Sequence, residues 1–168
     1  ADDLRNICAE TIRLFDPHKP KAPFSRYLFI VNAALEGYGG LEHRSSTVLL
    51  CKRDQLPYLD HDPKKPKKSY EELLGLCSHE YIHAWLVKRI EAKAFQPYDL
   101  GQRNYTRLLW LFEGFTSYYD DLQLVRSRCI SEKRYLELLA NTWNSVLRNP
   151  GRLKQSVADS SFDAWTKY

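Results

Sequence analysis

Methionine and long hydrophobic runs are both missing from this sequence of 168 residues. A helix that crosses a bilayer needs about 20 consecutive apolar residues, and no stretch approaches that length, so we expect no membrane span. The first residues, Ala1, Asp2 and Asp3, are acidic and lead directly into a helical pattern, which argues against a secretory signal. Because even an initiator methionine is missing, we expect an excised part of a longer protein or a processed product.

Closely spaced cysteine pairs are missing as well. The four cysteines, Cys8, Cys51, Cys77 and Cys129, form no Cys-x-x-Cys motif, so they do not resemble a structural zinc site. The sequence leaves open whether they are reduced core residues or form two disulfides.

A strong excess of one charge is also lacking, since the net charge is only +4. Much of it lies in a short, proline-interrupted run of lysines, Lys64, Lys65, Lys67 and Lys68. Such runs can bind nucleic acid or act as localisation signals. Acidic residues on both flanks favour a solvated surface loop instead, and we expect no nucleic-acid partner.

The composition, with 43% hydrophobic and 27% charged residues, is that of an ordinary soluble folded protein of one domain. Periodicity and turn residues predict an α+β fold, in which a small sheet is followed by three helices stacked against it. Ser69 and Glu72 have the spacing of a capping box at a helix start. The predicted helices cover residues 3–15, 69–90, 106–126 and 131–147, the predicted strands cover 26–35 and 47–51, and Gly37, Gly39 and Gly40 mark a turn between the strands.

The central helix contains the sequence His79-Glu80-Tyr81-Ile82-His83. Residues four apart are neighbours on one helix face, so both imidazoles can point at one metal ion. Glu80 lies one step round the helix, where it can accept a proton from the attacking water rather than bind the metal. The alternative is two histidines bound to backbone or water and a glutamate in a salt bridge.

A third ligand is expected from the next helix. Leu108 to Phe112 is apolar at every position, which indicates a helix buried on most of its surface, and Glu113 follows directly. A buried carboxylate needs a partner, and a metal ion held by two histidines would be one. Gly114 suggests a close approach of two helices. Asp120 could orient a ligand histidine, but an exposed helix carboxylate is the expectation we favour.

These residues predict a single zinc ion bound by His79, His83 and Glu113, with one coordination position left for water. Glu80 would act as general base, and the chemistry would be metal-assisted amide hydrolysis. A purely structural zinc site would usually have a fourth protein ligand and would not need Glu80.

Longer segments resemble a known family. The stretches HEYIHAW, KAFQPYD and NYTRLLWLFEGFTSYYDDL, with GGLEHRSSTVLL upstream, resemble the glycyl aminopeptidase family of PDZ-containing bacterial metallopeptidases, which are gluzincins with a thermolysin-like catalytic domain. The resemblance extends from about Leu4 to Tyr168 and implies that His79, His83 and Glu113 bind zinc and Glu80 is the base. It implies an aminopeptidase that releases small N-terminal residues, glycine or alanine, from a peptide with a free N-terminus.

The segment from Gly39 to His43 is similar to the Gly-x-Met-Glu-Asn motif of related aminopeptidases, with leucine for methionine and histidine for asparagine. The similarity implies that Glu42 holds the α-ammonium of the substrate, and that the backbone around Gly40 lies along the peptide. The alternative for Glu42 is a turn residue between two strands.

The resemblance also predicts what lies outside this sequence. We expect residues 1–168 to be a truncated catalytic domain, with the family's β-domain and PDZ domain absent. We expect the tyrosine that stabilises the oxyanion just beyond Tyr168, so that the fragment binds zinc but hydrolyses peptides poorly. Two functions remain as alternatives: an endopeptidase of the same fold, or a non-catalytic binding module stabilised by metal. The oligomeric state and the compartment, cytoplasm or periplasm of a bacterium, stay open.

Overall fold

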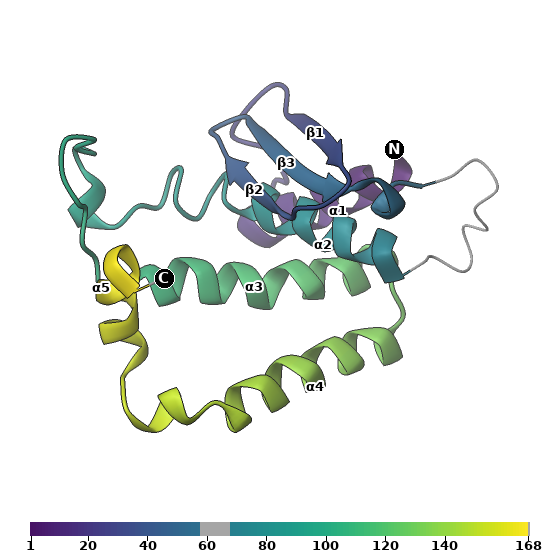
Figure 1. Cartoon of the computed structure of the whole chain (residues 1–168). Coiled ribbons are helices and arrows are strands. Elements are labelled where there is room, and N and C mark those ends of the chain that lie inside the picture. The colour runs from purple at the N-terminus through teal and green to yellow at the C-terminus, as the bar shows by residue number, and fades with distance from the viewer. Residues whose placement is uncertain (58–67, 168) are drawn as a thin grey trace.

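A computed structural model describes residues 1–57 and 68–167. Within this part of the chain the fold is α+β, with one three-stranded sheet and five α-helices (Figure 1). None of its helices is both long enough and apolar enough to cross a membrane. Most of the lysine run, residues 64–67, lies outside the described residues, and Lys68 begins a helix.

The sheet has the strand order β1-β3-β2. β1 (Leu28–Ala34) pairs in parallel with β3 (Ser46–Lys52), and β2 (Gly39–Glu42) pairs antiparallel with β3 on its other side. β3 alternates regularly, with Thr47, Leu49 and Cys51 buried and the residues between them more exposed. This alternation turns one face of the sheet toward the helices.

The turn expected at Gly39 and Gly40 is wrong, because both residues belong to β2, where they pair with Leu50 and Leu49. Glycine has a low strand propensity, so the local pattern indicates a turn, but pairing with β3 overrides that preference. A Cβ added to Gly37, which has a φ of +113°, would lie 2.6 Å from Leu50, so the turn lies just before β2.

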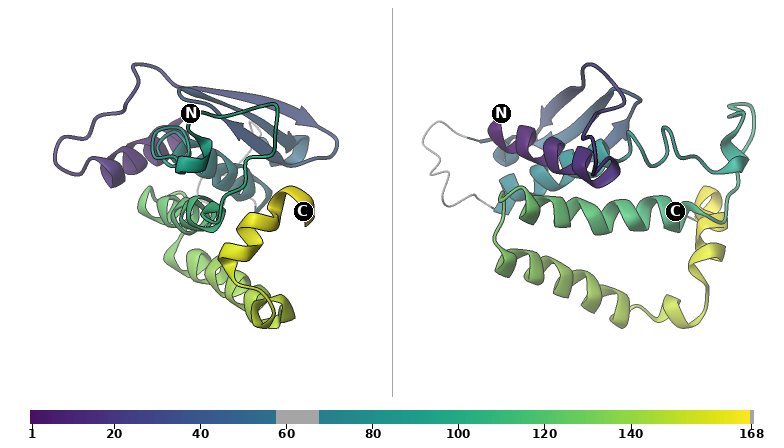
Figure 2. Two further views of the ribbon diagram at one scale, coloured as in Figure 1. Left: turned by 90° about the vertical axis from the view of Figure 1, so that its left-hand side faces the viewer. Right: turned by 180° about the vertical axis from the view of Figure 1, so that it is seen from behind.

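The helices form successive layers below the sheet (Figures 1 and 2). α1 (Asp2–Phe15) and α2 (Lys68–Ile82) lie next to the sheet, and α3 (Leu109–Arg126) packs on α2 from the other side. α4 (Glu132–Arg148) packs on α3, and α5 (Val157–Lys167), which the sequence did not predict, lies against the start of α3. The expected stack of three helices on the sheet is therefore wrong: only α2 of the three contacts the strands extensively.

Three clusters of buried side chains hold these layers together. Leu49 and Cys51 of β3 pack on Leu73, Leu76 and Cys77 of α2. Ile7, Leu74, Leu124 and Ile130 join α1, α2 and α3. An aromatic cluster around Tyr81 and Trp85 contacts Phe15, Phe24, Tyr27 and Phe29. All four cysteines carry free thiols, so the disulfide alternative does not hold.

α2 differs from its prediction at both ends. The helix begins at Lys68, so Ser69 is not the residue that precedes it. The Ser69 hydroxyl donates to the Asp54 carbonyl at 3.0 Å instead of accepting from a helix amide, and the predicted capping box at Ser69 is therefore wrong. The helix ends at Ile82 rather than near Ile90. After Ile82 the chain forms turns, and Val87 has a φ of +92°, which a right-handed helix does not accommodate.

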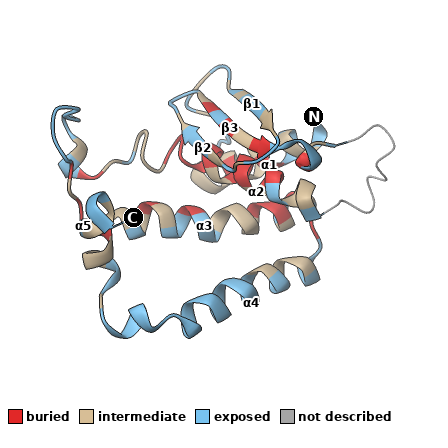
Figure 3. Cartoon of the chain, in the orientation of Figure 1, coloured by how far each residue is buried: buried red, intermediate tan, exposed pale blue. Residues whose placement is uncertain are grey.

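α4 is the least buried of the long helices (Figure 3). Its residues are all exposed or intermediate, although Ser131 caps its start by accepting from the Arg134 amide. An ion pair of 2.6 Å between Arg134 Nε and Glu71 Oε2 connects α4 directly to α2.

The layering predicts a sharp contrast between two leucines. Leu124→Ala removes a side chain that is 1% exposed, and we expect it to lower the free energy of unfolding by about 2–5 kcal/mol. Leu136→Ala on α4, where the residue is 60% exposed, should change it by less than about 0.5 kcal/mol. Urea unfolding followed by circular dichroism measures both, and equal losses would contradict this assignment of the core.

Candidate metal centre

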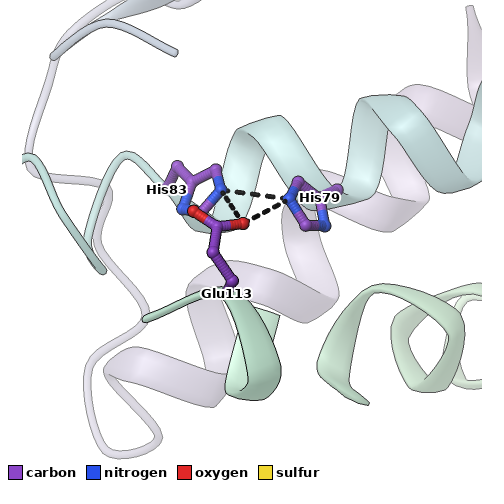
Figure 4. A group of neighbouring side chains, drawn as sticks. All are labelled: His79, His83 and Glu113. Carbon is purple, nitrogen blue, oxygen red and sulfur yellow. Dashed lines mark hydrogen bonds and ion pairs between the residues drawn. The ribbon is translucent and has the colours of Figure 1, made fainter. Parts of the chain in front are cut away.

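The two histidines of the His79-Glu80-x-x-His83 motif face each other (Figure 4). His79 lies in the last turn of α2, and His83 follows the end of the helix but keeps the helical spacing through a bond from its amide to the His79 carbonyl. Their Nε2 atoms are 3.1 Å apart. The helical spacing therefore brings two imidazole nitrogens to one point, as the sequence indicates.

Glu113, in the first turns of α3, completes a triangle (Figure 4). Its Oε2 is 3.4 Å from His79 Nε2 and 3.6 Å from His83 Nε2. Ligands of a tetrahedral zinc ion, each about 2.0–2.2 Å from the metal, lie about 3.3 Å from one another. The three observed separations fit that geometry, so these residues could hold a metal ion.

The other ring nitrogen of each histidine has its own partner. His79 Nδ1 lies 2.9 Å from Asp120 Oδ2, and His83 Nδ1 lies 3.2 Å from the Leu86 carbonyl. Each acceptor requires a proton on Nδ1, which leaves the Nε2 lone pair free to face the centre of the triangle. Partners of this kind orient histidines that ligate metals.

The pKa values of His79 and Glu113 shift in opposite directions because the two side chains lie so close together. Burial disfavours the charged form of His79, but hydrogen bonds to Asp120 and Glu113 outweigh it and raise the pKa to about 10. Burial likewise opposes ionisation of Glu113, yet bonds from His79 and His83 lower its pKa to about 2. In that state the positive charge of His79 and the negative charge of Glu113 attract each other, in the place where a cation would act.

Glu80 lies beside the triangle and is 5% exposed. Among the described residues its Oε2 has no hydrogen-bond partner. A Cβ added to Gly40 would lie 2.3 Å from Glu80 Oε1, so the backbone of β2 lies directly against this carboxylate. Burial raises the pKa of Glu80, which brings it closer to that of a general base at neutral pH.

Glu42 ends β2 and lies two residues beyond Gly40 along the strand. Its Oε1 is 3.1 Å from Lys88 Nζ, and its side chain is 18% exposed. Lys88 belongs to the turn that follows His83, and nothing in the sequence singled it out. Glu42 is thus a partly buried carboxylate already positioned to bind an ammonium group.

Two expectations about α3 are wrong. Leu108 and Trp110 are 42% and 40% exposed, and the Glu113 side chain is 47% exposed, so this part of the helix is not buried on most of its surface. A Cβ added to Gly114 would meet nothing within 4 Å, so no close helix approach explains that glycine. α2 covers α3 along one side, and some of the apolar residues 108–112 lie on the side that α2 does not cover.

The favoured expectation for Asp120 is also wrong. Its side chain is 15% exposed and bonded to His79, so it is not an exposed helix carboxylate. Its backbone carbonyl also accepts from Ser78 Oγ at 3.0 Å. The sequence signal was present, because Asp120 lies two turns after Glu113 on the same face.

A cavity of about 470 Å³ adjoins the triangle. Its walls come from the start of β2, from α2 up to Glu80, from the stretch of α3 that follows Glu113, and from α4. The predicted site residues that line it are Gly40, His79 and Glu80. The site is therefore open to a ligand on this side.

Comparison with known proteins agrees with these features. Residues 72–168, more than half of the chain, match the family model described as M61 glycyl aminopeptidase. The chain is also similar to the crystal structure of an aminopeptidase N family protein from Idiomarina loihiensis, at 47% identity and a TM-score of 0.92. That match covers 98% of this chain and 27% of the other, so this chain spans about a quarter of that protein. No curated protein matches.

The family resemblance drawn from the sequence motifs is thereby confirmed. The matched residues include the two histidines, Glu80 and Glu113. The chain belongs to the M61 glycyl aminopeptidase family.

Proposed function

We propose that this chain is the catalytic part of a zinc aminopeptidase that releases small N-terminal residues, glycine or alanine, from peptides. The observation that carries the proposal is the triangle of ligand atoms 3.1–3.6 Å apart, with both histidine Nδ1 atoms already bonded and Glu80 beside it. Two imidazoles and a carboxylate form a donor set that suits zinc. The family description supports the aminopeptidase activity and the glycine preference.

Zinc held by His79, His83 and Glu113 would supply Lewis acidity at the scissile carbonyl and lower the pKa of a bound water. Glu80 accepts the proton of the attacking water on its unpartnered Oε2 and returns it to the leaving amine. Asp120 holds the His79 ring in place throughout. Gly40 leaves the space that Glu80 needs, because any Cβ there would overlap the carboxylate.

The substrate would lie along β2. Among the described residues this strand pairs only with β3, so its outer edge can bond to an extended peptide. Glu42 binds the α-ammonium in place of Lys88, two residues along the strand from Gly40. An anchor at a fixed distance from Glu80 limits cleavage to the first peptide bond.

A Glu80→Gln variant should keep its zinc but lose its peptidase activity. We expect about one zinc per chain in both the unsubstituted protein and the variant, because Glu80 is not a ligand, while glycyl p-nitroanilide hydrolysis falls by at least about 100-fold. Elemental mass spectrometry on protein purified without chelators measures the metal. Glu113→Gln serves as the comparison and should lose most of the zinc. Equal activity of Glu80→Gln and the unsubstituted protein would refute the proposal.

Asp120→Asn tests the orientation of His79. We expect zinc affinity to fall by about 10–100-fold, because an amide is a weaker acceptor for the Nδ1 proton. Competition with a chromogenic chelator measures the affinity. Asp121→Asn, a matched loss of charge at the next position, should leave zinc affinity nearly unchanged. An unaltered affinity in Asp120→Asn would show that the hydrogen bond does not serve the metal.

Glu42→Ala distinguishes an aminopeptidase from an endopeptidase. We expect it to abolish hydrolysis of glycyl p-nitroanilide, which needs the ammonium anchor, while N-acetylated peptides are affected little. Glu36→Ala, at an exposed position outside β2, is the control. If both substrate types are hydrolysed as before, Glu42 only pairs with Lys88, and the endopeptidase alternative gains support.

A further inference from the structure

We propose that the 470 Å³ cavity beside the metal centre receives the side chain of the second substrate residue and favours a long basic one, lysine or arginine. This inference rests on the proposed aminopeptidase function and adds a substrate class to it. It follows from where the cavity lies, how a peptide would run along β2, and which charges line the walls.

The cavity is lined by β2, α2, α3 and α4, and in the first three of these it lies on one side of the metal centre. From β2 it is lined by Gly39 and Gly40, and from α2 by residues up to Glu80. From α3 it is lined by residues after Glu113. Glu42 and Lys88 lie at the opposite end, because Glu42 ends β2 and Lys88 follows His83.

A peptide anchored by its ammonium at Glu42 must therefore run past Gly40 and Glu80 toward Gly39. Its direction is opposite to that of β2, which is the antiparallel pairing that a free strand edge accepts. The scissile bond lies next to Glu80, so the residue after that bond comes to the cavity. Glu80 lines this cavity and is 5% exposed, so the cavity begins at the carboxylate beside the scissile bond.

The walls carry more negative than positive charge. Arg134 is the cation that lines the cavity, and it is already paired with Glu71 at 2.6 Å and Glu137 at 3.3 Å. Glu72 and Asp121 also line the cavity. Glu72 Oε2 accepts from Gln55 Nε2 at 2.9 Å, and Arg134 is close enough to act electrostatically on Asp121, but neither carboxylate forms an ion pair with a Lys or Arg of the described residues. A substrate ammonium or guanidinium would supply the missing positive charge, whereas an acidic side chain would be repelled.

Two leucines and a third glycine also line the cavity, together with Tyr38, Ser117 and Thr142. Leu76 and Leu138 line it and can contact the methylene stem of lysine or arginine. Gly75 lies inside α2, where glycine costs about 1 kcal/mol relative to alanine. A Cβ there would come no closer than 4.0 Å to any neighbour, so packing does not require the glycine. Its effect is to widen the cavity.

The test compares Ala-Lys-amide with Ala-norleucine-amide, which has the same stem without the ammonium. We expect the zinc-loaded chain to hydrolyse the lysine peptide with a kcat/KM about tenfold higher. Asp121→Asn should reduce that ratio to below about threefold, since it removes a carboxylate of the wall. Asp2→Asn, at a side chain that is 81% exposed on α1, is the matched control and should keep the full ratio.

Gly75→Leu is a second, independent variant. It should lower kcat/KM for Ala-Lys-amide at least tenfold more than for Ala-Gly-amide, whose second residue needs no cavity. Equal kcat/KM for the lysine and norleucine peptides, or a preference unchanged by Asp121→Asn, would overturn the inference.

Failure of the proposed function would look different, because then hydrolysis of every one of these peptides would be no faster than with the Glu80→Gln variant. In that event titration calorimetry of the same two amides with the zinc-loaded chain decides the inference. Tighter binding of the lysine peptide that Asp121→Asn removes would support the basic cavity, and equal affinities would refute it.

Discussion

The packing of α2 on α3 sets the relative positions of His79, Glu113 and Asp120, and the geometry of the site depends on it. His79 lies between two carboxylates of α3, with Glu113 at its Nε2 and Asp120 at its Nδ1. A bond from Ser78 Oγ to the Asp120 carbonyl fixes the two helices at the same level. Leu74 and Leu124 pack between the helices one turn away. A shift of either helix by one turn, about 5.4 Å, would separate both carboxylates from the imidazole.

The sheet contributes the remaining side of the site. β3 is held to α2 by the buried cluster around Leu49 and Leu76, and β2 is held to β3 by pairing. This succession brings the Gly40 backbone against Glu80, a contact that only a residue without a side chain permits. The candidate ligands, Glu80 and the strand edge thus come from α2 and its continuation, from α3 and from β2. Apolar packing, strand pairing and the Ser78–Asp120 hydrogen bond hold these elements in place.

The chemistry of the site could be predicted from the sequence more fully than its surroundings. The spacing of His79 and His83 fixes their geometry locally, and Glu113 stands out as an acid after an apolar run. The orienting role of Asp120 could be proposed from its spacing to Glu113 but not preferred, because a carboxylate on a helix looks the same whether it faces water or another helix. β2 was missed for a similar reason, since its pairing with β3 is non-local. The end of α2 was also missed, because the positive φ of Val87 cannot be inferred from the spacing of apolar residues.

The outer edge of β2 pairs with no other strand in the part of the chain that the structure describes, and such an edge carries a risk of aggregation that the short length of the strand keeps small. An unpaired edge can join the edge of another copy of the protein as readily as a peptide, and long flat edges lead to aggregation. β2 has four residues and begins with two glycines, of which Gly39 has a φ of +155°. So short a strand offers few bonds to a second sheet. The same four residues are enough to pair with a dipeptide, so an edge of this length suits the proposed substrate and offers little to self-association.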